Sequence, residues 1–490
     1  MEAFSIEQSI LESKKEINEL FELIKNKSNE LEAYEAENII FSRVMKIGMC
    51  ALKGYFAEKG TGDIGKELIL EDEVALKKIS GLRGKDYFSV FGKLKVPRSY
   101  YFKEGYKGIM PLDEQANLPE RCYSYLLQEW MDLFSIRDSF GEAKISLTKL
   151  LGLDIKQSRF EIISRESCSS YDEFYKTKEI PEPSSEGKYK VASFDGKGVP
   201  VIKKEAAKIK ARLGKGEKRQ KKKEALVGVS YTVDPKSRIT EDVAKNLVYP
   251  EQAKKIDEEH QENIIKAKNI RRIASLERPK QKVMEEIIND VETRDSENNT
   301  PLIVVMDGAL YLWDKIAKLL NKKNYIGILD IIHVIEYLWI VANTLYGEKN
   351  PHGTKWVYDH LLSILKGRIG YVIGGLRQIL TKQSKTLNKT KYNAINTAIT
   401  YFDNHRRWMK YDVYLLAGYP IGSGIVESSC ALVVKNRMEG IGRRWSIKGA
   451  ESTLLLRSIY TSNDWDKYWK KHRNLEKKRL YKNTVQLKVA

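Results

Sequence analysis

The chain has 490 residues, with 85 lysine and arginine residues against 66 aspartate and glutamate residues, so its formal net charge is +19. This length exceeds one ordinary hydrophobic core, and we expect two to four domains. Hydrophobic residues make up 42% and aromatic residues 10%, which excludes a disordered chain. The excess of positive charge indicates a polyanionic partner, either nucleic acid or a negative membrane surface.

Targeting and redox signals are weak. The sequence has no apolar run of about 18 residues, and its first residues are too polar and acidic for a signal peptide. The four cysteines lie far apart without a paired motif, so neither a disulfide framework nor a cysteine zinc site is expected. We therefore predict a soluble, cytoplasmic protein with no membrane partner and no zinc. The cysteines are Cys50, Cys122, Cys168 and Cys430.

The N-terminal part reads as helices followed by a small β-module. Residues 1–65 carry an apolar stripe at helical spacing, which is typical of packing or self-association. Residues 66–115 change to short aromatic and β-branched runs punctuated by glycine, which predicts two or three strands. The lysines and arginines of this module make it basic: Lys93, Lys95, Arg98 and Lys103.

Residues 116–180 return to a helical pattern. Within them, residues 140–168 form one periodic helix, a Gly-Leu-Asp turn and a second helix. This pattern resembles a helix-turn-helix, whose second helix would enter a major groove, although any two-helix corner with a glycine turn looks the same. Residues 181–188 are rich in Pro, Ser and Gly and form the best linker in the chain.

Strand texture begins at residue 189, with Asp195 at the centre of the run YKVASFDGKGVPVI. A basic stretch at 203–223 follows, with eleven lysines and arginines against two glutamates, and a second strand is predicted at 225–234. Most charge runs are only solvated, but a nearly single-signed loop between two strands favours contact with a phosphate backbone. The candidate DNA-binding residues here are Lys215, Lys218, Arg219, Lys221 and Lys222.

A polar helical region is predicted at 250–294, and an apolar strand then ends in Asp307 before an amphipathic helix. A run that is apolar on both faces is typical of a central, covered strand in an α/β sheet. A shorter strand ends in Asp330, with His333 just beyond it, and the next seventy residues are helical. This order predicts an α/β core in two parts, residues 189–345 and 416–465, separated by a helical insertion at 346–415 and followed by a basic tail at 466–490.

The stretch Tyr419 to Trp445 combines a turn, a helix and a cationic cluster. Its PIGSG turn places Ser423 as a candidate helix cap, and the helix is expected from Ile425 to about Met438. Glu427 lies in the first turn, where it either favours the helix dipole or holds a metal. The cationic cluster contains Lys435, Arg437, Arg443, Arg444, Trp445 and Lys448.

Asp195 and Asp307 belong to predicted strands, and catalytic groups of open α/β sheets gather beyond strand ends. The simpler alternatives are an Asp-Gly turn for Asp195 and a helix cap for Asp307. The glycine after each acid would let a substrate backbone approach closely. If Glu427 joins them, three carboxylates need a cation, and oxygen ligands select Mg²⁺ or Mn²⁺. Two such ions can promote in-line attack on a phosphodiester.

Several motifs together resemble a known family. In chain order over the C-terminal 300 residues they read SFDGKGVP, VVMDGALYLW, ILDIIHVIEYLW, YPIGSGIVESSC, VKNRMEG and GRRWSIKGAE. With them the chain resembles bacterial insertion-sequence transposases of the ISKra type, which are Asp-Asp-Glu transposases on an RNase H-like fold. Relatives often carry paired cysteines before PLDE, and this chain has none there, so no zinc is expected.

The resemblance implies that Asp195, Asp307 and Glu427 are catalytic acids holding two Mg²⁺ or Mn²⁺ ions. It implies a mixed sheet flanked by helices, with an all-helical insertion before the catalytic glutamate. Asp330 and His333 match a DxxH element of related transposases, with either an auxiliary role near the cleaved strand or a structural one.

The implied activity is cleavage of insertion-sequence ends and strand transfer into target DNA. Its partners would be double-stranded DNA, namely terminal inverted repeats and target, and further copies of the chain in a homo-oligomer at the bacterial nucleoid. Lys435, Arg437, Arg443 and Arg444 would contact phosphates, and Trp445 would stack on DNA or belong to the core. The alternatives are a catalytically inactive DNA-binding protein and a structure-selective nuclease without strand transfer.

Overall fold

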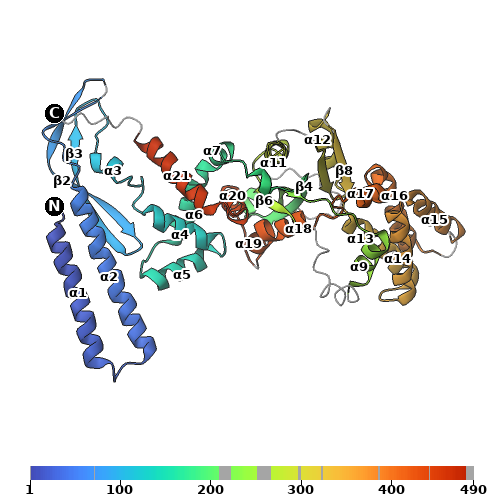
Figure 1. Ribbon diagram of the computed structural model, residues 1–490, viewed down its shortest axis with the longest axis horizontal. Helices are drawn as coiled ribbons and strands as arrows, with labels where there is room; N and C mark the ends of the chain where they lie inside the picture. Colours follow the sequence, from blue (N-terminus) through green and yellow to red (C-terminus); the bar gives the residue numbers. More distant parts are fainter. Residues whose placement is uncertain are drawn as a thin grey trace. The chain divides into compact units, whose positions relative to one another are not determined.

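The computed structural model describes residues 2–70, 72–208, 222–250, 266–295, 300–321, 324–383, 387–440 and 442–481 (Figure 1). The chain divides into two compact units. The first combines Met1–Thr177 with Trp465–Ala490, and the second is Lys178–Asp464. In the described part of the chain, no helix is both long enough and apolar enough to cross a membrane.

The first unit begins with a helical hairpin and a small sheet. Helices α1 (Ile6–Lys27) and α2 (Ala33–Lys59) pack against each other, so the predicted helical region is interrupted by a turn. Strands β1 (Glu67–Ile69), β2 (Ala75–Ser89) and β3 (Gly92–Phe102) form an antiparallel sheet in the order β1-β2-β3. The predicted β-module is therefore present.

The rest of the first unit is helical. Helix α5 ends at Gly152, whose φ of 66° is left-handed, and α6 follows after a short turn, so the two-helix corner is present. Phe160 and Ile163 of α6 are buried in the core of this unit. Whether α6 reads a DNA groove remains a prediction. The helices are α3 (Pro111–Gln115), α4 (Tyr125–Ser135), α5 (Phe140–Leu151), α6 (Gln157–Ser167), 3-10 turn η1 (Cys168–Ser170), α7 (Tyr171–Lys176) and α21 (Trp465–Leu480).

The second unit is built on a five-stranded mixed sheet in the order β6-β5-β4-β7-β8. Strand β5 runs antiparallel to both of its neighbours, β6 and β4, whereas β4, β7 and β8 run parallel to one another. The predicted α/β class is thus confirmed. The strands are β4 (Tyr189–Pro200), β5 (Lys222–Val233), β6 (Lys268–Ser275), β7 (Leu302–Met306) and β8 (Tyr325–Leu329).

The register of the parallel strands fixes what lies at their ends. Phe194 of β4 pairs with Met306 of β7, and Met306 pairs with Leu329 of β8. All five residues of β7 are buried, as its continuous apolar sequence predicts for a central strand. The next residue along each of the three strands is therefore at the same level of the sheet.

Strand β6 corrects the prediction of a wholly helical segment at 250–294, of which 251–265 lie outside the described residues. The segment contains β6 and then α11 (Lys280–Glu292). Arg271 and Arg272 interrupt the alternation of apolar and polar residues that would have identified a strand. Arg272 instead donates from Nε to the Ser429 hydroxyl at 2.9 Å, so this edge strand holds its charges inside the fold.

Helices surround the sheet, and α13 to α17 gather beside β8 (Figure 1). Within the described residues, 351–417 contain helices and no strand, as predicted for the insertion. The elements are 3-10 turns η2 (Pro183–Ser185) and η4 (Arg406–Trp408) and helices α8 (Lys203–Ala206), α9 (Thr240–Val248), α12 (Leu310–Leu319), α13 (Ile331–Tyr346), α14 (Pro351–Leu365), α15 (Ile369–Lys382), α16 (Lys389–His405), α17 (Tyr411–Ala417), α18 (Gly424–Ser429), α19 (Asn436–Met438) and α20 (Ile447–Thr461).

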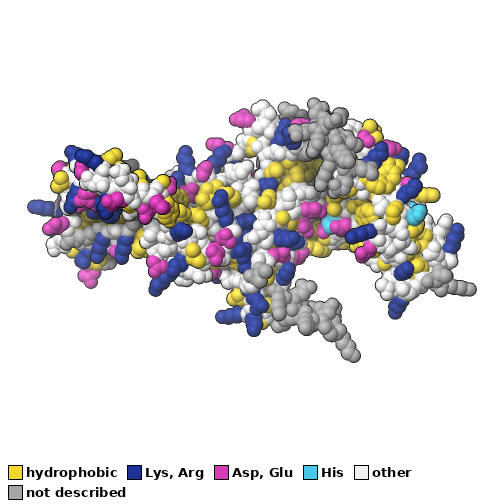
Figure 2. All heavy atoms as spheres, turned by 90° about the horizontal axis from the view of Figure 1, so that it is seen from below, with side chains coloured by type: hydrophobic (Ala, Val, Ile, Leu, Met, Phe, Trp, Pro, Cys, Tyr) yellow, Lys and Arg dark blue, Asp and Glu magenta, His cyan; other side chains and the backbone are white. Residues whose placement is uncertain are grey.

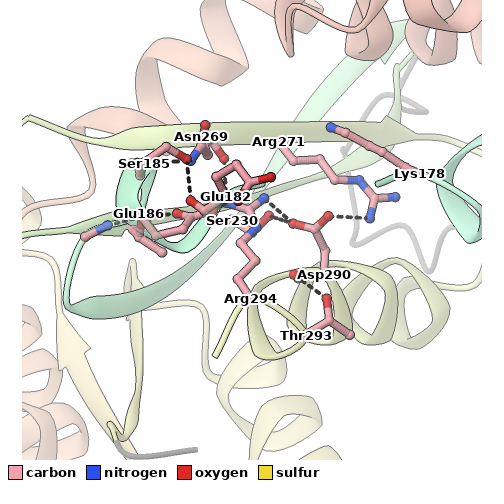
Figure 3. A network of polar contacts seen from close by, with 12 residues as sticks. Lys178, Glu182, Ser185, Glu186, Ser230, Asn269, Arg271, Asp290, Thr293 and Arg294 are labelled. Carbon is pink, nitrogen blue, oxygen red and sulfur yellow. Dashed lines mark hydrogen bonds and ion pairs between the residues drawn. The ribbon is translucent and has the colours of Figure 1, made fainter. Parts of the chain in front are cut away.

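A buried ion network ties α11 to the sheet (Figure 3). Asp290 accepts from Arg271 at 3.2 Å and from the Ser230 hydroxyl at 2.6 Å, and it also pairs with Arg294. Burial raises the pKa of Asp290, but Arg271, Arg294 and Ser230 lower it more, so its pKa lies below the ordinary value. The stabilisation is present at neutral pH and is lost as the pH falls through this lowered value.

We predict that Asp290→Ala lowers the free energy of unfolding by about 3–5 kcal/mol, because it leaves two buried guanidinium groups without their shared carboxylate. Urea unfolding of the full chain at pH 7, followed by circular dichroism, measures the loss. Lys282→Ala, at an exposed position of the same helix, is the control and should change the value by less than about 0.5 kcal/mol. Equal stability of the two variants would contradict the prediction.

Candidate metal centre at the ends of the parallel strands

Three aspartates lie in one row at the ends of the parallel strands. Asp195, Asp307 and Asp330 each come one position after the paired residues of β4, β7 and β8. Neighbouring strands are about 4.8 Å apart, so the row brings three carboxyl groups to one edge of the sheet. Asp195 is therefore part of a strand and not of an Asp-Gly turn.

The loop that carries Asp307 is held from several sides. Its Oδ1 accepts from the Ala309 N–H at 3.1 Å, and its carbonyl accepts from the Trp313 indole at 2.8 Å. The next carbonyl, of Gly308, is 2.9 Å from Nε2 of buried His405. Burial raises the pKa of Asp307, the Ala309 hydrogen bond opposes this, and Asp195 adds to the rise. Asp307 is thus a half-buried acid beside another acid.

Asp330 is fully buried and anchors the PIGSG turn. Its Oδ1 accepts from the Ser423 N–H at 3.0 Å, and its Oδ2 accepts from the Ser423 hydroxyl at 2.6 Å. It also caps α13 through the Ile332 N–H at 3.1 Å. Ser423 is the N-cap residue of α18, as predicted, but its hydroxyl makes no capping bond to the helix, because it donates to Asp330.

Glu427 and His333 extend the row beyond Asp330. The Glu427 carboxyl lies 3.4 Å from the Ser423 hydroxyl, and loss of hydration together with the Asp330 charge raises its pKa. Nδ1 of His333 is 3.0 Å from Glu336 Oε2, and its Nε2 is 3.9 Å from Asp330 Oδ2. Burial lowers the pKa of His333, but Asp330 and Glu336 raise it more, so the net direction is upward.

One combination has the spacing of metal ligands. Ligand atoms of Asp330, His333 and Glu427 all lie within 4.8 Å of one another, and among the described residues this is the group of three that meets that spacing. Asp195 and Asp307 lie in the same row of strand positions as Asp330, but they do not belong to this group of three. The predicted acids thus occupy one edge of the sheet, while Asp330 and His333, predicted as auxiliary residues, are the nearest partners of Glu427.

Sequence analysis did not identify Cys430 as part of this region. Its thiol donates to Asp195 Oδ2 at 3.0 Å. It begins a π-helical turn, Cys430–Lys435, between α18 and α19, so the helix predicted over residues 425–438 is not a regular α-helix. π-turns often occur at functional sites, and this one joins the segment that carries Glu427 to the end of β4.

The glycines after the acids accommodate protein side chains. A Cβ at Gly196 would collide with the Glu224 carboxylate, and one at Gly308 would collide with the Tyr401 ring. The expectation that these glycines admit a substrate backbone is therefore wrong in this structure. Glu224 was also missed: it accepts from the Tyr311 hydroxyl at 2.7 Å and pairs with Lys280.

The predicted DNA-binding residues differ in burial, and some of them lie outside the described residues. Arg437 is 1% exposed and lies 4.3 Å from the ring centroid of Trp445, so the DNA contact predicted for Arg437 is corrected. Trp445 is 6% exposed and donates to the Met438 carbonyl, so the core role given as its alternative is confirmed. Lys435 and Arg444 are exposed, and Arg443 is half-buried. Lys222 is exposed and pairs with Glu439 at 3.1 Å, whereas the other predicted residues of the basic loop lie outside the described residues: Lys215, Lys218, Arg219 and Lys221.

Lysine and arginine side chains are interspersed with acidic ones on the face drawn in Figure 2. The net positive charge of the chain is thus not visible there as one continuous patch.

Comparison with known proteins adds no assignment, because no protein-family model matches the chain and no curated protein matches it. The geometry of the site therefore carries the functional argument.

We predict that Cys430 reacts with iodoacetamide far more slowly than Cys168 in the folded chain at pH 8. Burial and the neighbouring Asp195 raise the pKa of the Cys430 thiol, so its reactive thiolate is scarce, whereas Cys168 is half-buried. Peptide mass spectrometry after timed labelling measures both rates in the same sample. Similar rates in the native protein that both increase in urea would contradict the hydrogen bond to Asp195.

Proposed function

We propose that the chain is a metal-dependent Asp-Asp-Glu DNA transposase whose RNase H-like catalytic core is the second unit. The observation that carries the proposal is the row of aspartates at the ends of three parallel strands, with Glu427 beside it. Hydrolysis or transfer of a phosphodiester needs charge neutralisation more than a protein nucleophile, and carboxylates of this kind supply it by holding cations.

The order of elements supports the same proposal. Strands β4, β5 and β6 form an antiparallel meander, and β7 and β8 then extend the sheet in parallel on the other side of β4. The glutamate helix α18 comes late in the chain, after the helical segment α14 to α17. This is the arrangement that the motif resemblance leads us to expect, a mixed sheet with an insertion before the glutamate.

The residues fit hard divalent cations. Asp195, Asp307 and Glu427 offer only oxygen ligands, and the pKa values of Asp307 and Glu427 are raised first by burial and then by the neighbouring acids Asp195 and Asp330. These three residues would hold two Mg²⁺ or Mn²⁺ ions. When bound, such ions activate a water or a 3′-hydroxyl and stabilise the leaving oxygen. The Asp307 loop contributes rigidity, since Trp313 and His405 bind its backbone on both sides.

Exposed cations follow the glutamate helix along the chain. Lys435 and Arg444 are exposed and Arg443 is half-buried, which suits contacts to phosphates near the cleaved strand. The partners in this proposal are double-stranded element ends, target DNA and further copies of the chain, because two ends have to be processed together. The basic loop contributes to the proposal through its sequence alone.

We predict that Asp307→Asn reduces metal-dependent nicking of DNA that flanks the reading frame by at least about a hundredfold, since a bound metal supplies several kcal/mol of charge stabilisation. Labelled duplexes from both flanks, incubated with Mg²⁺ or Mn²⁺ and separated on denaturing gels, measure cleavage. Joined products on a second duplex measure strand transfer.

Asp314→Asn is the control for that experiment, because Asp314 is an exposed aspartate of α12, close in sequence to Asp307. It should retain full nicking. Equal nicking by both aspartate variants would overturn the catalytic assignment. Cleavage without any joined product would instead support a nuclease, and DNA binding without cleavage would support an inactive binding protein.

We predict that Lys435→Ala and Arg444→Ala each weaken binding to any duplex and lower the slope of log affinity against log salt by about 1, because each removes one phosphate contact. Fluorescence anisotropy at several salt concentrations measures the slope. Lys318→Ala, at an exposed position of α12, should leave it unchanged. A slope that is the same in all three variants would remove these residues from the DNA surface.

A further inference from the structure

We propose that Glu427, already one of the proposed catalytic acids, forms with Asp330 and His333 a mixed nitrogen and oxygen site for one of the two cations, Mn²⁺, next to the oxygen-only pair of Asp195 and Asp307. The proposal deepens the proposed function, because it divides the cations of one catalytic edge between two ligand sets of different chemistry. It is tested by metal binding without DNA, so it stands or falls apart from the transposase assignment.

The spacing of the ligand atoms supports a shared ion. They lie within 4.8 Å of one another and come from two elements, α13 with the residue that caps it and α18. Ligands at about 2.1 Å from an octahedral ion are about 3 Å apart when adjacent and about 4 Å apart when opposite. Small rotations of the exposed Glu427 side chain are enough to reduce the present spacing of the ligand atoms to these ligand–ligand distances.

The imidazole of His333 is oriented for coordination. Its Nδ1 lies 3.0 Å from Glu336 Oε2, which selects the tautomer with the proton on Nδ1 and leaves the lone pair on Nε2. That nitrogen is the one near Asp330. A histidine that donates one ring N–H to a carboxylate while its other nitrogen faces further ligands is the usual arrangement around protein-bound metals.

Asp330 is the rigid member of the set. It is fully buried, and three donors from Ser423 and Ile332 hold its carboxylate in place. Glu427, by contrast, is exposed, and its carboxylate makes a long contact, 3.4 Å from the Ser423 hydroxyl, so it can move toward an ion. A fixed carboxylate, an oriented imidazole and a movable carboxylate together form a site that can adjust to an ion.

The nitrogen ligand sets the preference. Mg²⁺ favours oxygen ligands alone, whereas first-row transition metals also bind imidazole nitrogen, and among them Mn²⁺ is the one that suits carboxylates best. We therefore expect the site to bind Mn²⁺ more tightly than Mg²⁺. Asp195 and Asp307 themselves offer only carboxylate oxygens, so this pair should discriminate less between the two ions.

The decisive measurement is pulsed electron paramagnetic resonance of Mn²⁺ bound to the full chain, with any affinity tag removed. Coordination by His333 gives modulation from a directly bound ¹⁴N nucleus. His333→Gln should abolish this modulation and raise the Mn²⁺ dissociation constant by about tenfold or more, as measured by calorimetry. His352→Gln, at an exposed histidine of α14, is the matched control and should change neither.

Glu336→Gln keeps the experiment informative if His333→Gln folds poorly, because Glu336 is exposed. It should weaken Mn²⁺ binding by about tenfold, since it replaces the charged acceptor that orients the ring with a neutral amide oxygen, while the nitrogen modulation remains. The proposal is overturned if the unmodified chain shows no nitrogen modulation, or if the modulation persists in His333→Gln. It is also overturned if Glu336→Gln and His352→Gln bind Mn²⁺ equally well.

Discussion

Repulsion between carboxylates that strand register forces side by side is the constraint around which the second unit is organised. Parallel pairing of β4, β7 and β8 leaves Asp195, Asp307 and Asp330 no freedom to separate along the strands. Local donors therefore surround them: the Cys430 thiol, the Ala309 N–H, and Ser423 with both its N–H and its hydroxyl. These bonds reduce the repulsion but do not neutralise it, and this remaining charge is the reason we propose that the edge holds a cation.

The helical insertion supports that edge from outside the sheet. Tyr401 of α16 occupies the space above Gly308 and stacks 3.9 Å from Tyr337, and His405 contacts the Gly308 carbonyl. Trp408 stacks 4.0 Å from Trp313, whose indole bonds the Asp307 carbonyl. A segment that separates Asp330 from Glu427 in sequence thus fixes the loop of a third acid. Its helices contribute to the site although none of its residues belongs to the metal-ligand group.

Several parts of this arrangement could be predicted from sequence because their signals are local. The apolar run of β7 and the acid after it indicate a covered strand with a carboxylate at its end. Strand β6 could not be predicted in the same way, because Arg271 and Arg272 are satisfied by partners far along the chain, Asp290 and Ser429. The π-turn leaves no mark in composition, since it differs from an α-helix by a single hydrogen-bond step.

The same reasoning explains the errors at the glycines and at the cations. Only cross-strand pairing places Glu224 of β5 beside Gly196 of β4, and spacing along the chain carries no information on it. The sequence predicts Arg437 at the surface and leaves Trp445 open between surface and core, because both lie among lysines and arginines. In the structure they stack on each other inside the fold. Charge in a sequence shows that a group needs a partner, but not whether that partner is solvent, DNA or a neighbouring ring.

The position of helix α21 in the chain affects the order in which the two units can fold during synthesis. It is the last described helix, yet it belongs to the first unit, where Tyr468 and Trp469 are fully buried and the Tyr468 hydroxyl bonds the Ser167 carbonyl. Domains generally fold as they leave the ribosome, N-terminal parts first. Here the first unit lacks part of its interior until α21 has been synthesised, whereas the sheet-containing unit has all its residues earlier. A nascent or prematurely terminated chain would therefore present a complete sheet-containing unit joined to an unfinished N-terminal one.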